Sequence, residues 1–171
     1  MTATVSIHQK TNLPSYDIEN PFKQREYLAK CLCQILADAY TLHLRTKTCC
    51  WNISKNIYPN LSRISELQSR RLNKVVDSVA KNIHKLGYKV PGSYRELMSL
   101  SSIPELEIND ISSIEKIIEK LIEANKTLSH NAYLVQLRAA NFNENSIADL
   151  LVHHREVYEQ NRWMLHSILE T

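Results

Sequence analysis

Four polar side chains at helical spacing stand out in the first half of this 171-residue chain. Ser62 and Glu66 form one pair and Asp77 and Lys81 form a second, each with the i,i+4 spacing that places two residues on one face of an α-helix. The two pairs are separated by close to whole helical turns, so we expect all four side chains to point roughly the same way. Such a polar stripe is either a solvated face or a functional site, and the surrounding elements must decide which.

The composition is that of a soluble globular protein with one domain. Hydrophobic residues make up 43% of the chain and charged residues 23%, and the length suffices to bury a core. Two glycines and five prolines leave few helix breakers. The formal charge of +3 is below what tight electrostatic binding to nucleic acid usually shows. Because there is no long apolar run and no signal-peptide pattern at the start, we expect no membrane association and a cytoplasmic location.

Four cysteines lie in the first third of the chain: Cys31, Cys33, Cys49 and Cys50. In a cytoplasmic protein these are expected to be free thiols rather than disulfides. The simplest interpretation makes them small buried hydrophobic residues, and the sequence assigns them no further role.

Two long amphipathic helices are predicted in the first half. Asn20 and Pro21 form a helix start, and apolar residues at steps of three and four continue to about Asn52. A break at Tyr58-Pro59-Asn60 precedes a second helix, which Gly87 closes in the position that favours a left-handed residue. Residues 1–20 show no sustained period and are predicted to be an N-terminal tail.

The second half predicts one short helix and two more long ones. Ser93 and Glu96 have capping-box spacing before a run of about eight residues. Ser112 and Glu115 repeat that spacing before a third long stripe that ends near residue 140, and Ser146 opens the fourth. The fold class is therefore all-α, a ferritin-like four-helix bundle over residues 21–171 with a short extra helix in the long connection between the second and third helices.

Several short motifs, in order and at matching spacing from about Tyr40 to the C-terminus, resemble the Dps family of mini-ferritins: Thr46-Lys47, Trp51-Asn52, Leu86-Gly87, the 91–96 segment Pro-Gly-Ser-Tyr-Arg-Glu, Ser101-Ser102-Ile103, Asp149-Leu150-Leu151 and the 163–167 segment Trp-Met-Leu-His-Ser. The resemblance implies a hollow homo-oligomer, a dodecamer, that takes up iron. Many members of this family also protect DNA, and the resemblance further implies protection from oxidative stress.

The resemblance also implies a diiron ferroxidase site at a two-fold interface between subunits. One subunit supplies a histidine before the Trp-Asn pair, then a histidine and a carboxylate four residues apart, and its partner supplies two more carboxylates. In this sequence the five positions carry Cys50, Ser62, Glu66, Asp77 and Lys81. Only Glu66 and Asp77 keep the required type, so they are the candidate metal ligands.

The other three positions argue against iron chemistry. A thiolate at Cys50 suits softer metals than a carboxylate-rich iron site, and the neutral hydroxyl of Ser62 is a poor ligand. Lys81 places a cation where an anion is needed, and at about 4 Å and an effective dielectric near 20 it would repel a divalent ion by roughly 8 kcal/mol. We predict that this ferroxidase site is lost and that any iron there is bound weakly. An ion pair between Lys81 and Glu66 of a neighbouring subunit would satisfy both charges without metal. Beside it, Trp51 is interpreted as a packing residue.

Three functions remain open. The first is a Dps-like cage that binds or stores iron without the usual ferroxidase site, either alone or co-assembled with another Dps-like subunit. The second is an active ferroxidase that uses hydrogen peroxide through Glu66, Asp77 and a recruited thiol or histidine, for which the candidates are His43, His84, His153 and His154. Whether the protein is an enzyme therefore stays undecided.

The third function is DNA binding without metal chemistry. A basic patch at Arg70, Arg71 and Lys74 on the second helix is its main support, although such runs usually form solvated faces. The N-terminal tail does not support it, because Lys10 is the only lysine before residue 20.

Overall fold

Five helices form the part of the chain that the computed structural model describes, residues 20–104 and 113–170. They are α1 (Pro21–Asn52), α2 (Pro59–Lys85), α3 (Tyr94–Leu100), α4 (Ile114–Asn141) and α5 (Asn145–Leu169). The predicted tail, residues 1–20, lies outside the described residues except for Asn20, as does part of the long connection. None of the described helices is long and apolar enough to cross a membrane.

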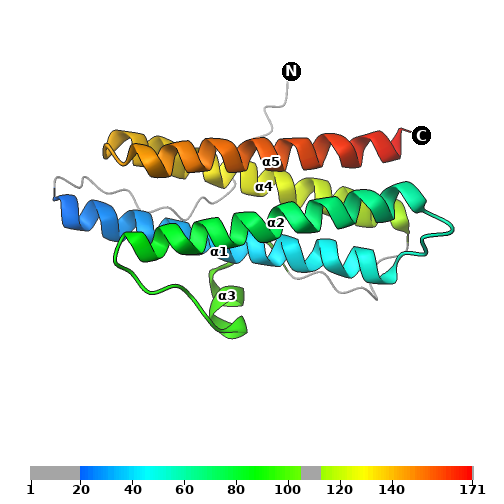
Figure 1. Ribbon diagram of the computed structural model, residues 1–171, viewed down its shortest axis with the longest axis horizontal. Helices are drawn as coiled ribbons and strands as arrows, with labels where there is room; N and C mark the ends of the chain where they lie inside the picture. Colours follow the sequence, from blue (N-terminus) through cyan, green and yellow to red (C-terminus); the bar gives the residue numbers. More distant parts are fainter. Residues whose placement is uncertain (1–19, 105–112, 171) are drawn as a thin grey trace, which may run out of the picture.

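The four long helices lie side by side as two antiparallel hairpins, α1 with α2 and α4 with α5 (Figure 1). The described part of the connection from α2 to α4 holds α3, which lies against α1 (Figure 1). This arrangement confirms the predicted ferritin-like bundle with a short extra helix. It places the start of α2 beside the end of α1, where the candidate residues lie.

The predicted starts of α1, α3, α4 and α5 are correct to within one residue, and α2 begins at Pro59, inside the predicted break at residues 58–60. The Asn20 side chain accepts a hydrogen bond from the Phe22 N–H at 2.9 Å, and Ser93 Oγ accepts from the Glu96 N–H at 3.2 Å. The cap of α4 is Ser113, which accepts from the Lys116 N–H at 3.4 Å, whereas the predicted cap Ser112 lies outside the described residues.

The fourth predicted helix starts one residue earlier than expected, at Asn145 rather than Ser146. Glu144 occupies its N-cap position without a capping hydrogen bond from its side chain. That carboxylate instead accepts from Arg25 Nε at 2.8 Å, which ties the start of α5 to the start of α1. This contact joins residues 119 positions apart, so no local sequence pattern could predict it.

Gly87 ends α2 in the left-handed region, with φ of +90°. A Cβ there would meet no atom within 4 Å, so the cost of Gly87→Ala is conformational alone. We expect Gly87→Ala to lower the free energy of unfolding by about 1 kcal/mol. Gly92→Ala is the matched control, since Gly92 has equal space and no positive φ, and it should be neutral or stabilising in the same denaturant titration.

The core is apolar and is built by all four long helices. Its fully buried members include Leu28, Leu32, Leu42, Leu61, Leu72, Ile83, Leu128 and Leu151. Cys31 and Cys49 belong to it, while Cys33 and Cys50 are half-buried, and all four are free thiols. The two buried thiols match the expectation of small buried hydrophobic residues.

One carboxylate is buried in this core. Asp38 of α1 has no solvent exposure and accepts hydrogen bonds from Ser101 Oγ, Ser102 N, Ser102 Oγ and Asn131 Nδ2 at 2.6–3.2 Å. Burial raises the pKa of Asp38, and these hydrogen bonds oppose the rise. Asp38 therefore fastens the segment after α3 to α1 and α4.

A buried imidazole on α5 should make stability depend on pH. Burial lowers the pKa of His154 from 6.5 to about 4, and the neighbouring His153 acts in the same direction. Below pH 6.5 the unfolded chain binds a proton that the folded chain binds only near pH 4, so stability is lost as the pH falls through this window. At about 1.4 kcal/mol for each pKa unit, the loss between pH 7 and pH 5 is about 2 kcal/mol.

We expect this loss to disappear in His154→Gln. Denaturant titrations of the wild type and the variant at pH 7 and pH 5 measure it directly. His130→Gln is the matched control, because His130 is exposed on α4 and is not among the groups that lower the pKa of His154, so the wild-type pH dependence should remain. Equal pH dependence in wild type and His154→Gln would show that His154 is not held neutral by the fold.

Candidate functional site

The polar stripe on α2 is less uniform than predicted. Ser62 is 3% exposed and faces the chain's interior, the side chain of Glu66 is 45% exposed, and Asp77 and Lys81 are exposed. Helix geometry explains the difference, because Glu66, Asp77 and Lys81 lie about 40°, 60° and 100° around the axis from Ser62. The residue spacing alone suggested that all four side chains point the same way. The rotation around the helix axis that accumulates from Ser62 to Lys81 separates the two ends of the stripe.

Glu66 already has a cationic partner within its own chain. Lys55, in the connection between α1 and α2, lies with Nζ 2.9 Å from Glu66 Oε1. The hydrogen bond and the charge of Lys55 lower the pKa of Glu66, and Glu66 raises the pKa of Lys55 in return. Lys81 of a neighbouring subunit was predicted for this role, and Lys55 was not. The signal that the sequence offered for this pair was the position of Lys55 in the short connection that leads into α2, the helix that carries Glu66.

Cys50 lies near this ion pair at the end of α1. Burial raises the pKa of its half-buried thiol, Glu66 acts in the same direction, and Lys47 and Lys55 oppose the rise. A thiol with a raised pKa stays protonated at neutral pH, and it is the thiolate that binds metals. The structure thus brings Cys50, Lys55 and Glu66 together as a thiol beside a closed ion pair.

Asp77 and Lys81 lie further along α2, beyond the reach of this cluster. Glu66 and Asp77 are about 16 Å apart along the helix axis, so they cannot share a metal ion within one chain. Within residues 20–104 and 113–170 of a single chain, no group of three or more His, Cys, Asp or Glu side chains could hold a metal ion. A site that uses both carboxylates therefore requires a second subunit.

The candidate histidines are dispersed. His43 is half-buried, and its Nδ1 lies 3.0 Å from the carbonyl oxygen of Ser69, while His84 is exposed in the last turn of α2. His153 is exposed on α5 with Nδ1 3.6 Å from Glu156 Oε2, and His154 is buried. The described part of one chain does not bring them together with Glu66 or Asp77 as a metal-binding group.

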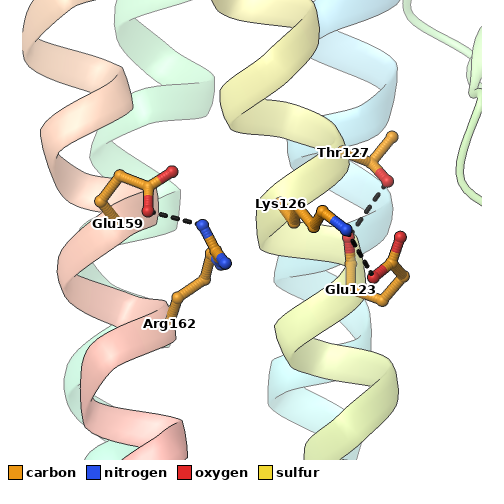
Figure 2. Close-up of polar contacts among 5 residues, drawn as sticks. All are labelled: Glu123, Lys126, Thr127, Glu159 and Arg162. Carbon is orange, nitrogen blue, oxygen red and sulfur yellow. Dashed lines mark hydrogen bonds and ion pairs between the residues drawn. The ribbon is translucent and has the colours of Figure 1, made fainter.

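Carboxylates elsewhere on the bundle form local surface ion pairs (Figure 2). On α5, Arg162 Nη1 lies 2.7 Å from Glu159 Oε2, and on α4, Lys126 Nζ lies 3.8 Å from Glu123 Oε2. Pairs of this kind at i,i+3 spacing on a solvated surface contribute about 0–1 kcal/mol to stability. They are features of the surface and not ligand sets.

Three large apolar or aromatic side chains within a few residues of Lys55 in the sequence are exposed. Trp51 is 68% exposed and Ile57 is 69% exposed, and Tyr58 beside them is also exposed. The interpretation of Trp51 as a packing residue is therefore wrong for a single chain, since its indole lies mostly in solvent. The segment that leads from the end of α1 into α2 therefore carries three large exposed apolar or aromatic side chains.

Similarity to known proteins extends over most of the chain. Residues 29–171 match a family model described as a ferritin-like domain. A low temperature-induced protein of Nostoc sp. is 26% identical over 159 residues, which cover 92% of this chain and 88% of that protein.

Solved structures of Dps proteins share the fold. Dps from Thermosynechococcus elongatus superposes with a TM-score of 0.82 at 16% identity, covering 87% of this chain and 94% of that chain. A Dps protein from Vibrio cholerae, described as a member of a broad superfamily of ferritin-like diiron-carboxylate proteins, gives 0.80 at 21% identity, covering 86% and 92%.

Proposed function

The chain belongs to the ferritin-like protein family, and on this premise we propose that it is a Dps-like cage subunit that binds and stores iron without oxidising it at the family's usual position. In this role iron is cargo, and its sequestration protects the cell from oxidative stress. The Dps fold, with TM-scores of 0.82 and 0.80, supports the cage architecture.

The observation that carries the proposal is the ion pair at Glu66. Of the two carboxylates at ligand positions, Glu66 is paired with Lys55 at 2.9 Å, so an incoming cation competes with an ammonium group for this carboxylate. The neighbouring Cys50 thiol has a raised pKa, and Ser62 is buried and neutral. These groups do not fit a diiron centre, which needs several anionic oxygen and imidazole ligands.

Assembly is the second part of the proposal. The exposed Trp51, Ile57 and Tyr58, which lie within a few residues of Lys55 in the sequence, supply apolar area for a second subunit to cover. We propose a homo-oligomer of the dodecameric kind, in the cytoplasm. Co-assembly with another Dps-like subunit would allow a mixed cage to oxidise iron while this chain contributes shell and storage surface.

Iron oxidation by the assembled protein tests the proposal. Ferrous iron and hydrogen peroxide are added, and ferric absorbance is followed against a protein-free reaction. We expect the wild type and Glu66→Ala to match the protein-free rate. Oxidation clearly faster than that rate, lost in Glu66→Ala but kept in the matched surface variant Glu156→Ala, would overturn the proposal and establish a modified ferroxidase that uses Glu66.

DNA binding is the second candidate function. Arg70 and Lys74 of the basic patch are exposed on α2, which makes them accessible in a single chain. A gel-shift titration across a salt series tests this directly, because phosphate contacts give a steep loss of affinity with salt. We expect no shift at physiological salt. A shift that Arg70→Gln with Lys74→Gln removes would establish DNA binding through this patch.

A further inference from the structure

The outward face of α2 carries charged side chains of both signs that its own chain leaves mostly unpaired. Five exposed cations lie along it: Arg63, Arg70, Lys74, Lys81 and Lys85. Two carboxylates, Glu66 and Asp77, accompany them. Within residues 20–104 and 113–170, the one ion pair that these seven side chains form is that of Glu66 with Lys55. A second α2 of the same sequence could therefore neutralise this face.

Symmetry limits how two copies of α2 can pair. In a parallel two-fold pair each residue faces its own copy, so every charge would meet a like charge. In an antiparallel two-fold pair, residue i of one copy faces residue j of the other, and residue j faces residue i. Glu66 and Asp77 are 11 positions apart, so both can face cations only where two cations are also 11 positions apart.

Three antiparallel registers meet this condition, and two of them bring like charges together. Pairing Glu66 with Lys74 puts Arg70 opposite Arg70 of the second copy. Pairing Glu66 with Lys85 puts Arg70 opposite Lys81. Pairing Glu66 with Lys81 puts Arg70 opposite a carboxylate, and no lysine or arginine of α2 lies directly opposite another. Because like charges that face each other across an interface are unfavourable, the charges select this third register.

Helix geometry supports the selected register. Arg70 and Asp77 are seven positions apart, which places them within about 20° of each other around the axis of α2. Glu66 and Lys81 differ by about 60°, a difference that a long lysine side chain can span. Lys55 contacts Oε1 of Glu66, so Oε2 can accept a hydrogen bond from a second ammonium group.

We propose that two copies of this chain associate through antiparallel α2 helices, with Arg70 of each copy paired with Asp77 of the other and Lys81 paired with Glu66. The two-fold axis passes between residues 73 and 74. The proposal rests on the assembly that the proposed function includes, and it specifies one interface of that assembly. At this interface the cations beside Glu66 and Asp77 are side chains of the protein.

Charge reversal at Arg70 and Asp77 tests the pairing in the full-length protein. Arg70→Asp and Asp77→Arg should each raise the dissociation constant of the dimer about tenfold or more, because each removes two ion pairs and creates two repulsions. The double variant restores both pairs with exchanged signs, so its dissociation constant should return to within about threefold of the wild-type value. Sedimentation velocity over a concentration series measures these constants.

A neutral substitution at Lys74 distinguishes the three registers. In the selected register Lys74 faces no carboxylate and lies near Lys74 of the second copy, so Lys74→Gln should keep or tighten the association. In either of the other registers Lys74 faces Glu66 or Asp77, and weaker association of Lys74→Gln would therefore overturn the proposal. Lys120→Glu, a charge reversal at an exposed position of α4, is the control and should leave the association unchanged.

Two further outcomes would contradict the pairing. A double variant that associates no better than either single variant would overturn the Arg70–Asp77 pair while the assembly itself stands. A wild type that stays monomeric at every concentration would overturn the pairing together with the assembly on which it rests. Neither measurement involves iron, so failure of this inference is distinguishable from failure of the proposed iron storage without oxidation.

Discussion

Supplying two of the three missing ligands should create ferroxidase activity at the α2 position. We expect the double variant Cys50→His with Lys81→Glu to oxidise ferrous iron with hydrogen peroxide about tenfold faster than the wild type, or more. Lys81→Glu replaces a repulsion of roughly 8 kcal/mol towards a divalent ion by an attraction of similar size. Tenfold corresponds to only about 1.4 kcal/mol, so this expectation allows for solvent screening and for lysine swinging away.

The double variant keeps Ser62, because that residue is 3% exposed and a histidine there would overpack the contact between α1 and α2. Lys81→Gln is the matched control, since it removes the cation without adding a ligand and should stay at the wild-type rate. Adding Lys55→Gln to the double variant should raise the rate further by freeing Glu66. No gain in either the double or the triple variant would show that these positions do not converge across subunits.

Asp38→Ala should lower the free energy of unfolding by roughly 3 kcal/mol, more than the loss expected for Gly87→Ala. The substitution removes a fully buried carboxylate and leaves four donors, two from Ser102 and one each from Ser101 and Asn131, without that acceptor. Hydrogen bonds to a charged group contribute about 1.5–3 kcal/mol each, and part of this loss is recovered as the donors reach water.

Denaturant titration at pH 7 measures the effect, and Asp149→Ala is the control. Asp149 is exposed on α5, so its loss should change stability by less than about 0.5 kcal/mol. Hydrogen exchange should locate the damage in Asp38→Ala at the segment after α3 before it spreads to the bundle. A loss below about 1 kcal/mol would mean that Asp38 is not the anchor of this segment.

Periodicity predicted the fold because it reports which face of each helix is apolar. Four long stripes and the proline, asparagine and serine signals at their starts were sufficient for a four-helix bundle with a short helix at Ser93. Helix starts were predicted less well than helix faces. The helix α2 begins at Pro59, inside the predicted break, and α5 begins at Asn145, one residue before the predicted Ser146.

The candidate site was predicted in position but not in its contacts. The i,i+4 rule placed Glu66 and Asp77 on α2, yet the rotation that separates Ser62 from Lys81 and the closeness of Lys55 to Glu66 depend on three-dimensional packing. Asp38 and the amides of Gln68, Asn125 and Asn161 were not identified either. A polar residue within an apolar helical stripe can either be buried in a hydrogen-bond network or be exposed at the surface. Only its burial in the three-dimensional structure distinguishes the two cases.

The proposed function requires that the Glu66 position does not hold iron. An anomalous-difference map from a crystal of the assembled protein soaked in ferrous iron decides this point. We expect no iron peak at Glu66, the Lys55–Glu66 distance kept near 2.9 Å, and any iron bound elsewhere on the cage. An iron peak bridging Glu66 of one subunit and Asp77 of its neighbour, with Lys55 turned away, would contradict the proposed function.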